Sequence, residues 1–261
     1  MRTEHLRYDE VLINYQTAPV VPAPYAYYYT MRITPAEGGG IQLQFDMKYL
    51  DREELDEDEI IGEGFTLNDD FSWQGNLPQV WVSELNSILT HSQYVQEAEE
   101  NELEEFIEVV MTQQGDAESG SPEDKETWAY FLQELMQAIF EAAGRENQFE
   151  MEYLRINSQK ETSISLNASF VNKTFSIQLD KQPREQMDWK KLEEVMGTVF
   201  KAEFMSDQAT ETRPTHEGTY ITTGDGLWYK LGEAVLNPTP KSKVLPQIEN
   251  LFDKLERRVA V

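Results

Sequence analysis

Apolar residues follow a period of two in the first part of the chain. They occupy alternate positions in residues 25–33, and after a glycine-rich connector the alternation returns in residues 41–49. This period is typical of a β-strand with one buried face, and a short connector containing glycine joins antiparallel neighbours. A run around Val11, followed by three prolines between positions 19 and 24, indicates one more strand. We therefore predict an antiparallel sheet at the start of the chain.

Helical spacing, with apolar residues every three or four positions, follows each group of strands. It occurs in four segments: 77–89, 122–143, 189–204 and 244–259. We expect Ser121 to be the N-cap of the second of these helices. The glycines at 62 and 64 argue against a helix in the preceding acidic stretch. Residues 97–111 fit either a helix or a short strand, and residues 114–121 are predicted to be a loop.

The second half of the chain repeats the order of the first. Strand alternation returns in residues 149–153, 164–170 and 175–179, and a tight hairpin is predicted around Gly224-Asp225-Gly226. Each half thus contains three strands, a helix, an ambiguous or hairpin segment and a second helix. We predict an α+β protein with antiparallel β-sheets covered by amphipathic helices. The order suggests two tandem copies of a βββ-α-(ββ)-α unit, covering residues 1–146 and 147–261.

Charge separates the two halves. The chain has a net charge of −26, and residues 1–150 carry 32 Asp and Glu against 7 Lys and Arg, whereas residues 151–261 carry 16 against 15. Most of the acid falls where the two halves differ, at 51–72 and 93–121. We therefore expect these two stretches to be charged surface insertions on the acidic unit 1–146, and the unit 147–261 to be a near-neutral scaffold.

Composition excludes several classes of function. Without cysteine there is no disulfide, thiolate zinc site or cysteine nucleophile. The acidic half lacks the Lys and Arg clusters that phosphate binding requires, so we expect no nucleic-acid partner. No apolar run is long enough to span a membrane, and the N-terminus lacks the apolar core of a signal peptide. We expect a cytoplasmic protein.

Motifs for catalysis are missing from the sequence. The three histidines, His5, His91 and His216, lack metal-ligand spacing, and no G-x-S-x-G element or complete phosphate loop occurs. A calcium loop that starts at Asp56 places Ile61 where glycine is required. The many carboxylate pairs are therefore interpreted as a solvated acidic face, and we predict no catalytic residue, metal or cofactor.

The tyrosines between positions 25 and 29 allow two interpretations. They could form an aromatic recognition surface, but a strand with one buried face explains them better. In that arrangement Tyr28 is the member that we expect to be exposed.

The leading hypothesis is a non-enzymatic adaptor or chaperone-like protein that binds a basic or amphipathic partner through residues 51–124. In its pattern of strands and helices and its acidity, the chain resembles small acidic secretion-chaperone-type domains. The candidate partner-binding residues are Asp56, Asp58, Glu59, Asp69, Asp70, Trp73, Glu102, Glu104 and Glu105. Binding through them should weaken with salt.

Two other functions stay open at this point. The protein could be a small-molecule binder or hydrolase-type enzyme that uses carboxylates in a cleft between the two units. Alternatively, a regular, phosphate-like spacing of carboxylates could mimic a nucleic acid.

Overall fold

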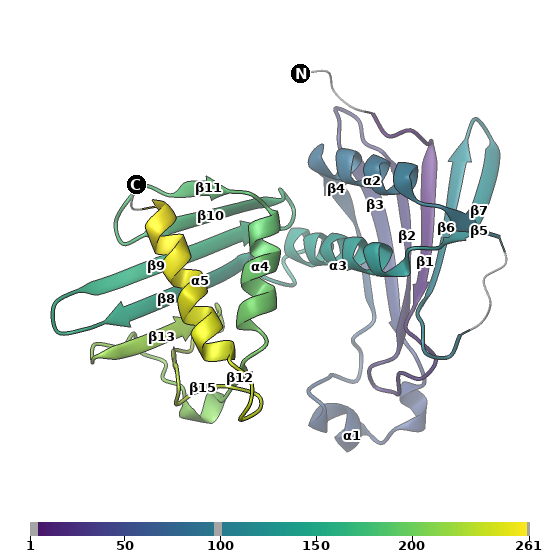
Figure 1. Ribbon diagram of the computed structural model, residues 1–261. Helices are drawn as coiled ribbons and strands as arrows, with labels where there is room; N and C mark the ends of the chain where they lie inside the picture. The colour runs from purple at the N-terminus through teal and green to yellow at the C-terminus, as the bar shows by residue number, and fades with distance from the viewer. Residues whose placement is uncertain (1–4, 97–100, 260–261) are drawn as a thin grey trace. The chain divides into compact units, whose positions relative to one another are not determined.

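The protein is described by a computed structural model that covers residues 5–96 and 101–259 (Figure 1). The chain divides into two compact units, Met1–Glu146 and Asn147–Val261, which we call unit 1 and unit 2 and describe separately. Both combine antiparallel sheet with helices, which confirms the predicted α+β class. The expectations for the N-terminal residues 1–4 and for residues 97–100 of the acidic stretch lie outside the described residues.

Unit 1 is built on an antiparallel sheet of seven strands in the order β4-β3-β2-β1-β6-β7-β5. Its strands are β1 (Glu10–Gln16), β2 (Tyr27–Pro35), β3 (Ile41–Tyr49), β4 (Phe71–Leu77), β5 (Tyr94–Val95), β6 (Phe106–Gln113) and β7 (Asp116–Pro122). The first four form a meander, and β6 returns beside β1, where Ile13 is paired with Val109. Because side chains alternate along a strand, one face of this sheet is apolar and the other polar.

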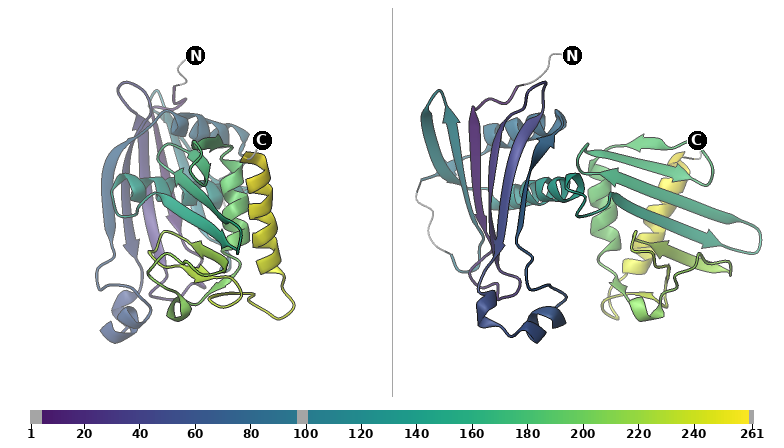
Figure 2. Two further views of the ribbon diagram at one scale, coloured as in Figure 1. Left: turned by 90° about the vertical axis from the view of Figure 1, so that its left-hand side faces the viewer. Right: turned by 180° about the vertical axis from the view of Figure 1, so that it is seen from behind.

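Helices α2 (Val80–His91) and α3 (Lys125–Ala142) cover the apolar face of the unit 1 sheet (Figures 1 and 2). Trp81 and Trp128 are fully buried, and the ring of Phe140 meets that of Phe45 at a centroid distance of 6.3 Å. The N-cap of α3 is Asp124, whose carboxylate accepts a hydrogen bond from the Thr127 amide at 3.1 Å. Ser121 was therefore the wrong N-cap. It lies in β7 instead.

The acidic stretch 93–121 contributes to the core, contrary to expectation. Strand β6 lies inside the sheet between β1 and β7, and Ile107 and Val109 are fully buried. The segment 114–121, expected to be a loop, largely forms β7, whose residues 116–119 are exposed. A strand with few apolar residues has no alternation to reveal it. The view of 93–121 as a surface insertion is therefore wrong for β6.

The stretch between β3 and β4 is an excursion from the sheet. It contains a 3₁₀ turn, η1 (Arg52–Glu54), and a short helix, α1 (Glu57–Gly62), in which Ile60 is the buried residue. The Glu59 carboxylate accepts a hydrogen bond from the Asp56 amide at 3.0 Å, which satisfies a free donor at the helix start. We expected no helix here, but α1 ends at the first of the two glycines, Gly62, and Gly64 lies beyond it with a positive φ of 85°. We call residues 50–70 the insertion.

Unit 2 has a sheet of six strands in the order β11-β10-β9-β8-β13-β14, with a separate β12–β15 pair. Its strands are β8 (Phe149–Ile156), β9 (Glu161–Ser169), β10 (Thr174–Leu179), β11 (Glu185–Met187), β12 (Glu203–Phe204), β13 (Gly218–Thr222), β14 (Tyr229–Lys230) and β15 (Val235–Leu236). Helices α4 (Lys190–Val199) and α5 (Val244–Val259) cover one face (Figures 1 and 2). Tyr153 stacks on Phe252 with ring centroids 4.1 Å apart, which fixes α5 on the sheet.

The two units share one topology. In each, a meander of four strands is followed by a helix, a second group of strands and a second helix. One strand of the second group, β6 in unit 1 and β13 in unit 2, pairs with the first strand of its unit. The link between the third and fourth strands is residues 180–184 in unit 2 and the much longer insertion in unit 1. Common topology is compatible with a duplication, which stays a prediction. None of the helices in the described residues is long and apolar enough to cross a membrane.

Candidate protein-interaction surface

Three segments of unit 1 come together at the end of the sheet where α1 lies (Figures 1 and 2). They are the β1–β2 connection 17–26, the insertion, and residues 101–106 before β6. The Val20 amide donates to the Glu102 carbonyl at 3.1 Å, and Arg52 Nη2 donates to the Pro24 carbonyl at 3.3 Å. The connection therefore lies between the other two segments. We call the three together the α1-end surface.

Exposed apolar side chains concentrate on the α1-end surface. Among the described residues, eight large apolar side chains are exposed, and six of them belong to this surface: Val20, Tyr25, Ile61, Leu67, Leu103 and Phe106. Leu103 is 75% exposed, the most of all. Single exposed apolar residues are normal, but such a concentration at one end of a sheet is typical of an interaction site.

The same surface is strongly acidic. Its three segments contain 13 Asp and Glu and one basic residue, Arg52. In the described part of the chain, the ion pairs that involve these segments are Arg52–Asp69 and Lys125–Glu104. Most of the carboxylates are therefore not compensated by a cation, and they leave a negative potential around the apolar side chains.

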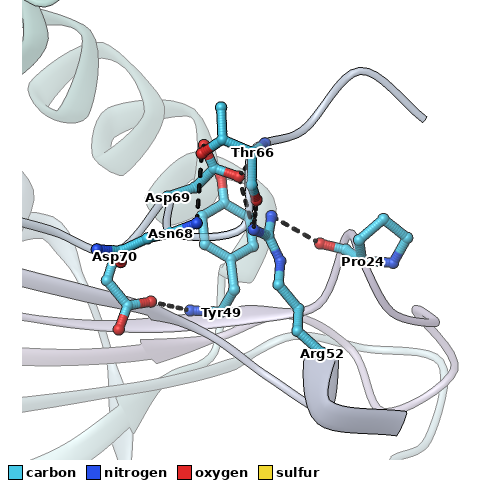
Figure 3. A network of polar contacts seen from close by, with 7 residues as sticks. All are labelled: Pro24, Tyr49, Arg52, Thr66, Asn68, Asp69 and Asp70. Carbon is cyan, nitrogen blue, oxygen red and sulfur yellow. Dashed lines mark hydrogen bonds and ion pairs between the residues drawn. The ribbon is translucent and has the colours of Figure 1, made fainter. Parts of the chain in front are cut away.

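Arg52 holds the insertion together (Figure 3). Its Nη1 donates to the Asp69 carboxylate at 2.6 Å and to the Thr66 carbonyl at 2.9 Å. Its guanidinium lies 3.8 Å from the centre of the Tyr49 ring and 4.7 Å from that of Phe65. The Arg52 and Asp69 side chains are only 11% and 13% exposed, so the one cation of this surface is used inside the chain.

Asp69 and Asp70, two of the predicted partner-binding residues, are bonded within the insertion. Asp69 also accepts hydrogen bonds from the Thr66 amide at 2.9 Å and its hydroxyl at 2.7 Å. Burial acts to raise the pKa of Asp69, but the hydrogen bonds from Arg52 and Thr66 outweigh it and hold the pKa below its ordinary value. Asp70 accepts from the Tyr49 amide at 3.0 Å, which fastens the insertion to β3 (Figure 3).

Trp73 lies outside the α1-end surface. It is on β4, and its ring covers Gly75 so closely that a Cβ at position 75 would sit 2.2 Å from Trp73 Cζ2. We therefore leave Trp73, Asp69 and Asp70 out of the surface that we propose to bind a partner.

The other six predicted residues lie on the α1-end surface, in two groups. Asp56, Asp58 and Glu59 are exposed at the start of α1, and Glu102, Glu104 and Glu105 lie on the segment before β6. Glu104 forms an ion pair with Lys125 at 2.7 Å, and this bond lowers the pKa of Glu104.

A hollow of about 790 Å³ opens beside residues 101–106. Among the described residues, four carboxylates line it, together with the aromatic ring of Phe106 and a single cation, Lys125. The carboxylates are those of Glu102, Glu104, Glu105 and Glu108. An arrangement of this kind suits a cationic side chain with an aliphatic stem, because the head meets carboxylates while the stem meets the ring.

The tyrosines form a stack beside this surface. The Tyr15 ring lies 4.7 Å from that of Tyr29 and 5.9 Å from that of Tyr27, and burial raises the pKa of all three, so they stay neutral. The exposed member of the run is Tyr25 and not Tyr28, contrary to our expectation. Tyr28 is flanked on neighbouring strands by Gln16 and Lys48, whereas Tyr25 precedes β2.

The apolar members Val20, Ile61 and Leu67 were not predicted from the sequence. Each stands in a segment without strand or helix periodicity. The periodicity of the sequence therefore does not show whether the side chain is buried or exposed. For Ile61 and Leu67 the available signal was an apolar residue between carboxylates and outside any periodic segment, whereas Val20 lies in a stretch without acidic residues.

The described residues contain no group of three or more histidine, aspartate and glutamate side chains arranged to hold a metal ion. No protein-family model, curated protein or solved structure matches the chain.

Proposed function

We propose that the protein is a non-enzymatic, adaptor- or chaperone-like protein that binds a basic amphipathic segment of a partner protein at the α1-end surface. The observation that carries this proposal is the coincidence of six exposed apolar side chains with 11 Asp and Glu on one surface, which are the 13 of its segments without Asp69 and Asp70. Carboxylates alone would be a solvated face, and apolar residues alone would favour self-association. The combination favours a partner that is both cationic and apolar.

The two kinds of residue would act at different stages of binding. The uncompensated carboxylates attract a cationic segment over a distance of about 8 Å at physiological salt, which raises the association rate. Leu103, Ile61 and Phe106 then bury apolar area, at roughly 25 cal/mol per Å², and slow dissociation. The Arg52 network holds the insertion in place before binding, which reduces the entropy lost on association.

The electrostatic part of the proposed binding is tested with an 18-residue peptide of lysine and leucine. We expect its Kd, measured by fluorescence anisotropy, to rise about tenfold or more between 50 and 500 mM NaCl. The triple variant Asp58→Asn, Glu102→Gln, Glu105→Gln should slow association. The matched control, Glu37→Gln, Asp116→Asn, Glu118→Gln, removes three exposed carboxylates outside the surface and should leave it unchanged.

The apolar part of the proposed binding is tested with the double variant Leu103→Ser, Ile61→Ser. This variant should release the peptide faster and leave the association rate nearly unchanged. Phe200→Ser in unit 2 is the control, because Phe200 is also exposed, at 49%. Equal affinity of the surface and control variants, or binding that does not depend on salt, would contradict the proposal.

A further inference from the structure

The outer edge of β4 is unpaired in the unit 1 sheet, where β3 is its only neighbour among the described strands. At the two ends of the β2–β3 pair, the Leu50 amide donates to the Ala26 carbonyl and the Ala36 amide donates to the Gly40 carbonyl. Both bonds join even-numbered residues, and in this register the even-numbered residues of β3 therefore make the backbone hydrogen bonds to β2. Backbone groups alternate sides along an antiparallel strand, and the odd-numbered residues of β3 and β4 therefore bond to each other. The amides and carbonyls left pointing outward belong to Ser72, Gln74 and Asn76.

These outward groups have no backbone partner in the described part of the chain. The strand itself, Phe71–Leu77, has seven residues without a charge or a proline. Natural sheets usually protect an open edge with charged residues, proline or a very short strand, because unpaired backbone groups attract another strand. The edge of β4 lacks all three forms of protection.

Unit 2 shows the contrast within the same molecule. At the equivalent place in its sheet, β11 (Glu185–Met187) has three residues, begins with a glutamate and follows Pro183 and Arg184. At the other edge of the unit 1 sheet, β7 carries Asp116 and Glu118 and is paired with β5 at its end. The open edge of β4 is therefore not a general property of this topology.

We propose that β4 binds an extended segment of the partner as an added strand. This inference rests on the proposed function and names its binding mode. A second copy of the chain is a poor occupant, because residues 1–150 carry a net charge of −25 and would repel it. A basic segment is attracted instead. Since β4 starts at Phe71, directly after the insertion, the added strand continues onto the α1-end surface.

The side chains of β4 indicate which residues fit the added strand. On the face that α2 and α3 cover, it would run beside Phe71, Trp73 and Gly75, which favours apolar residues. On the polar face it would run beside Ser72, Gln74 and Asn76, which favours Thr, Ser or Asn. Lysine or arginine is expected at the end that passes Phe71 and meets the carboxylates of the insertion.

The test uses the full chain and a nine-residue peptide, two lysines followed by alternating valine and threonine. Gln74→Pro removes an outward amide that makes no bond to β3, so the existing ladder is kept. Gln74→Thr is the matched control, because it keeps the amide. We expect the proline variant to weaken binding about tenfold and the threonine variant to bind like the wild type. Hydrogen exchange at the Ser72 and Asn76 amides should slow in the wild-type complex.

Circular dichroism and thermal unfolding verify that Gln74→Pro is folded, and Ser72→Pro repeats the test at a second outward amide. Equal affinity of the proline and threonine variants would overturn the inference. If the Asp58, Glu102, Glu105 variant still weakens binding in that case, the proposed function stands without the added strand. If neither set of variants has an effect, both proposals fail. Self-association that Gln74→Pro abolishes in analytical ultracentrifugation would assign the edge to a second copy and overturn the proposed occupant.

Discussion

At the scale of single residues, Arg52 shows how one cation organises an acidic segment. It is the sole basic residue in 51–124, and its bonds join the start of the insertion to Thr66 and Asp69 and to the Pro24 carbonyl. A nearly buried ion pair of this kind is sensitive to loss of either partner, because the other charge is left without compensation.

Asp69→Asn should loosen the insertion in a pH-dependent way. Because the pKa of Asp69 is lowered in the folded protein, its stabilisation is complete above the ordinary value of 3.8 and is lost as the pH falls through the lowered value. At pH 7 we expect the free energy of opening of residues 51–70 to fall by about 2 kcal/mol, measured by hydrogen exchange. The difference from the wild type should shrink below pH 3.8. Asp116→Asn, an exposed control, should show neither effect; a constant difference across this range would contradict the role of the Asp69 charge.

At the scale of elements, local pattern predicted those strands whose apolar residues alternate over many positions. Strands β2, β3, β9 and β10 follow this rule, and so do the stripes of α2, α3 and α5. The rule did not decide between helix and strand for β6, and it missed β7. In β6 the apolar residues fit both periods, and the pairing with β1 decided between them.

The insertion can be exchanged for its counterpart in unit 2. Replacing residues 51–69 with residues 180–184 should leave unit 1 folded, because the same topology in unit 2 needs only that short link between β10 and β11. We expect unit 1 of this variant to unfold in a single cooperative transition in denaturant. We also expect it to lose the salt-dependent binding of the peptide. Failure of this variant to fold would mean that the insertion is part of the structural core of unit 1.

At the scale of the whole molecule, two units of one topology carry very different charge. Folding concentrates like charges in unit 1, and self-repulsion there opposes the compact state. Unit 2 is nearly balanced, and several of its charges are paired, as in Arg155–Asp253 at 2.6 Å. The charge asymmetry therefore has a consequence for stability as well as for binding.

Salt should stabilise unit 1 more than unit 2. With residues 1–146 and 147–261 expressed separately, raising NaCl from 20 to 500 mM screens the repulsion in unit 1 and should raise its Tm by several degrees. The Tm of unit 2 should change little, as followed by differential scanning calorimetry. An equal rise of the Tm in both units would show that salt stabilises them in a general way and not by screening the self-repulsion of unit 1.

The sequence by itself determined the α+β class, most strands and helices, and the division between an acidic and a near-neutral half. These properties depend on periodicity and composition, which are local or additive along the chain. Tertiary structure decided which acidic residues are paired with a cation, because Asp69 forms its ion pair with Arg52 only in the folded insertion. It also brought Val20 to Glu102 and left the edge of β4 open. No local pattern encodes the contacts between residues far apart in the chain or the order of strands in a sheet. The surface that we propose to bind a partner was therefore found only from the fold.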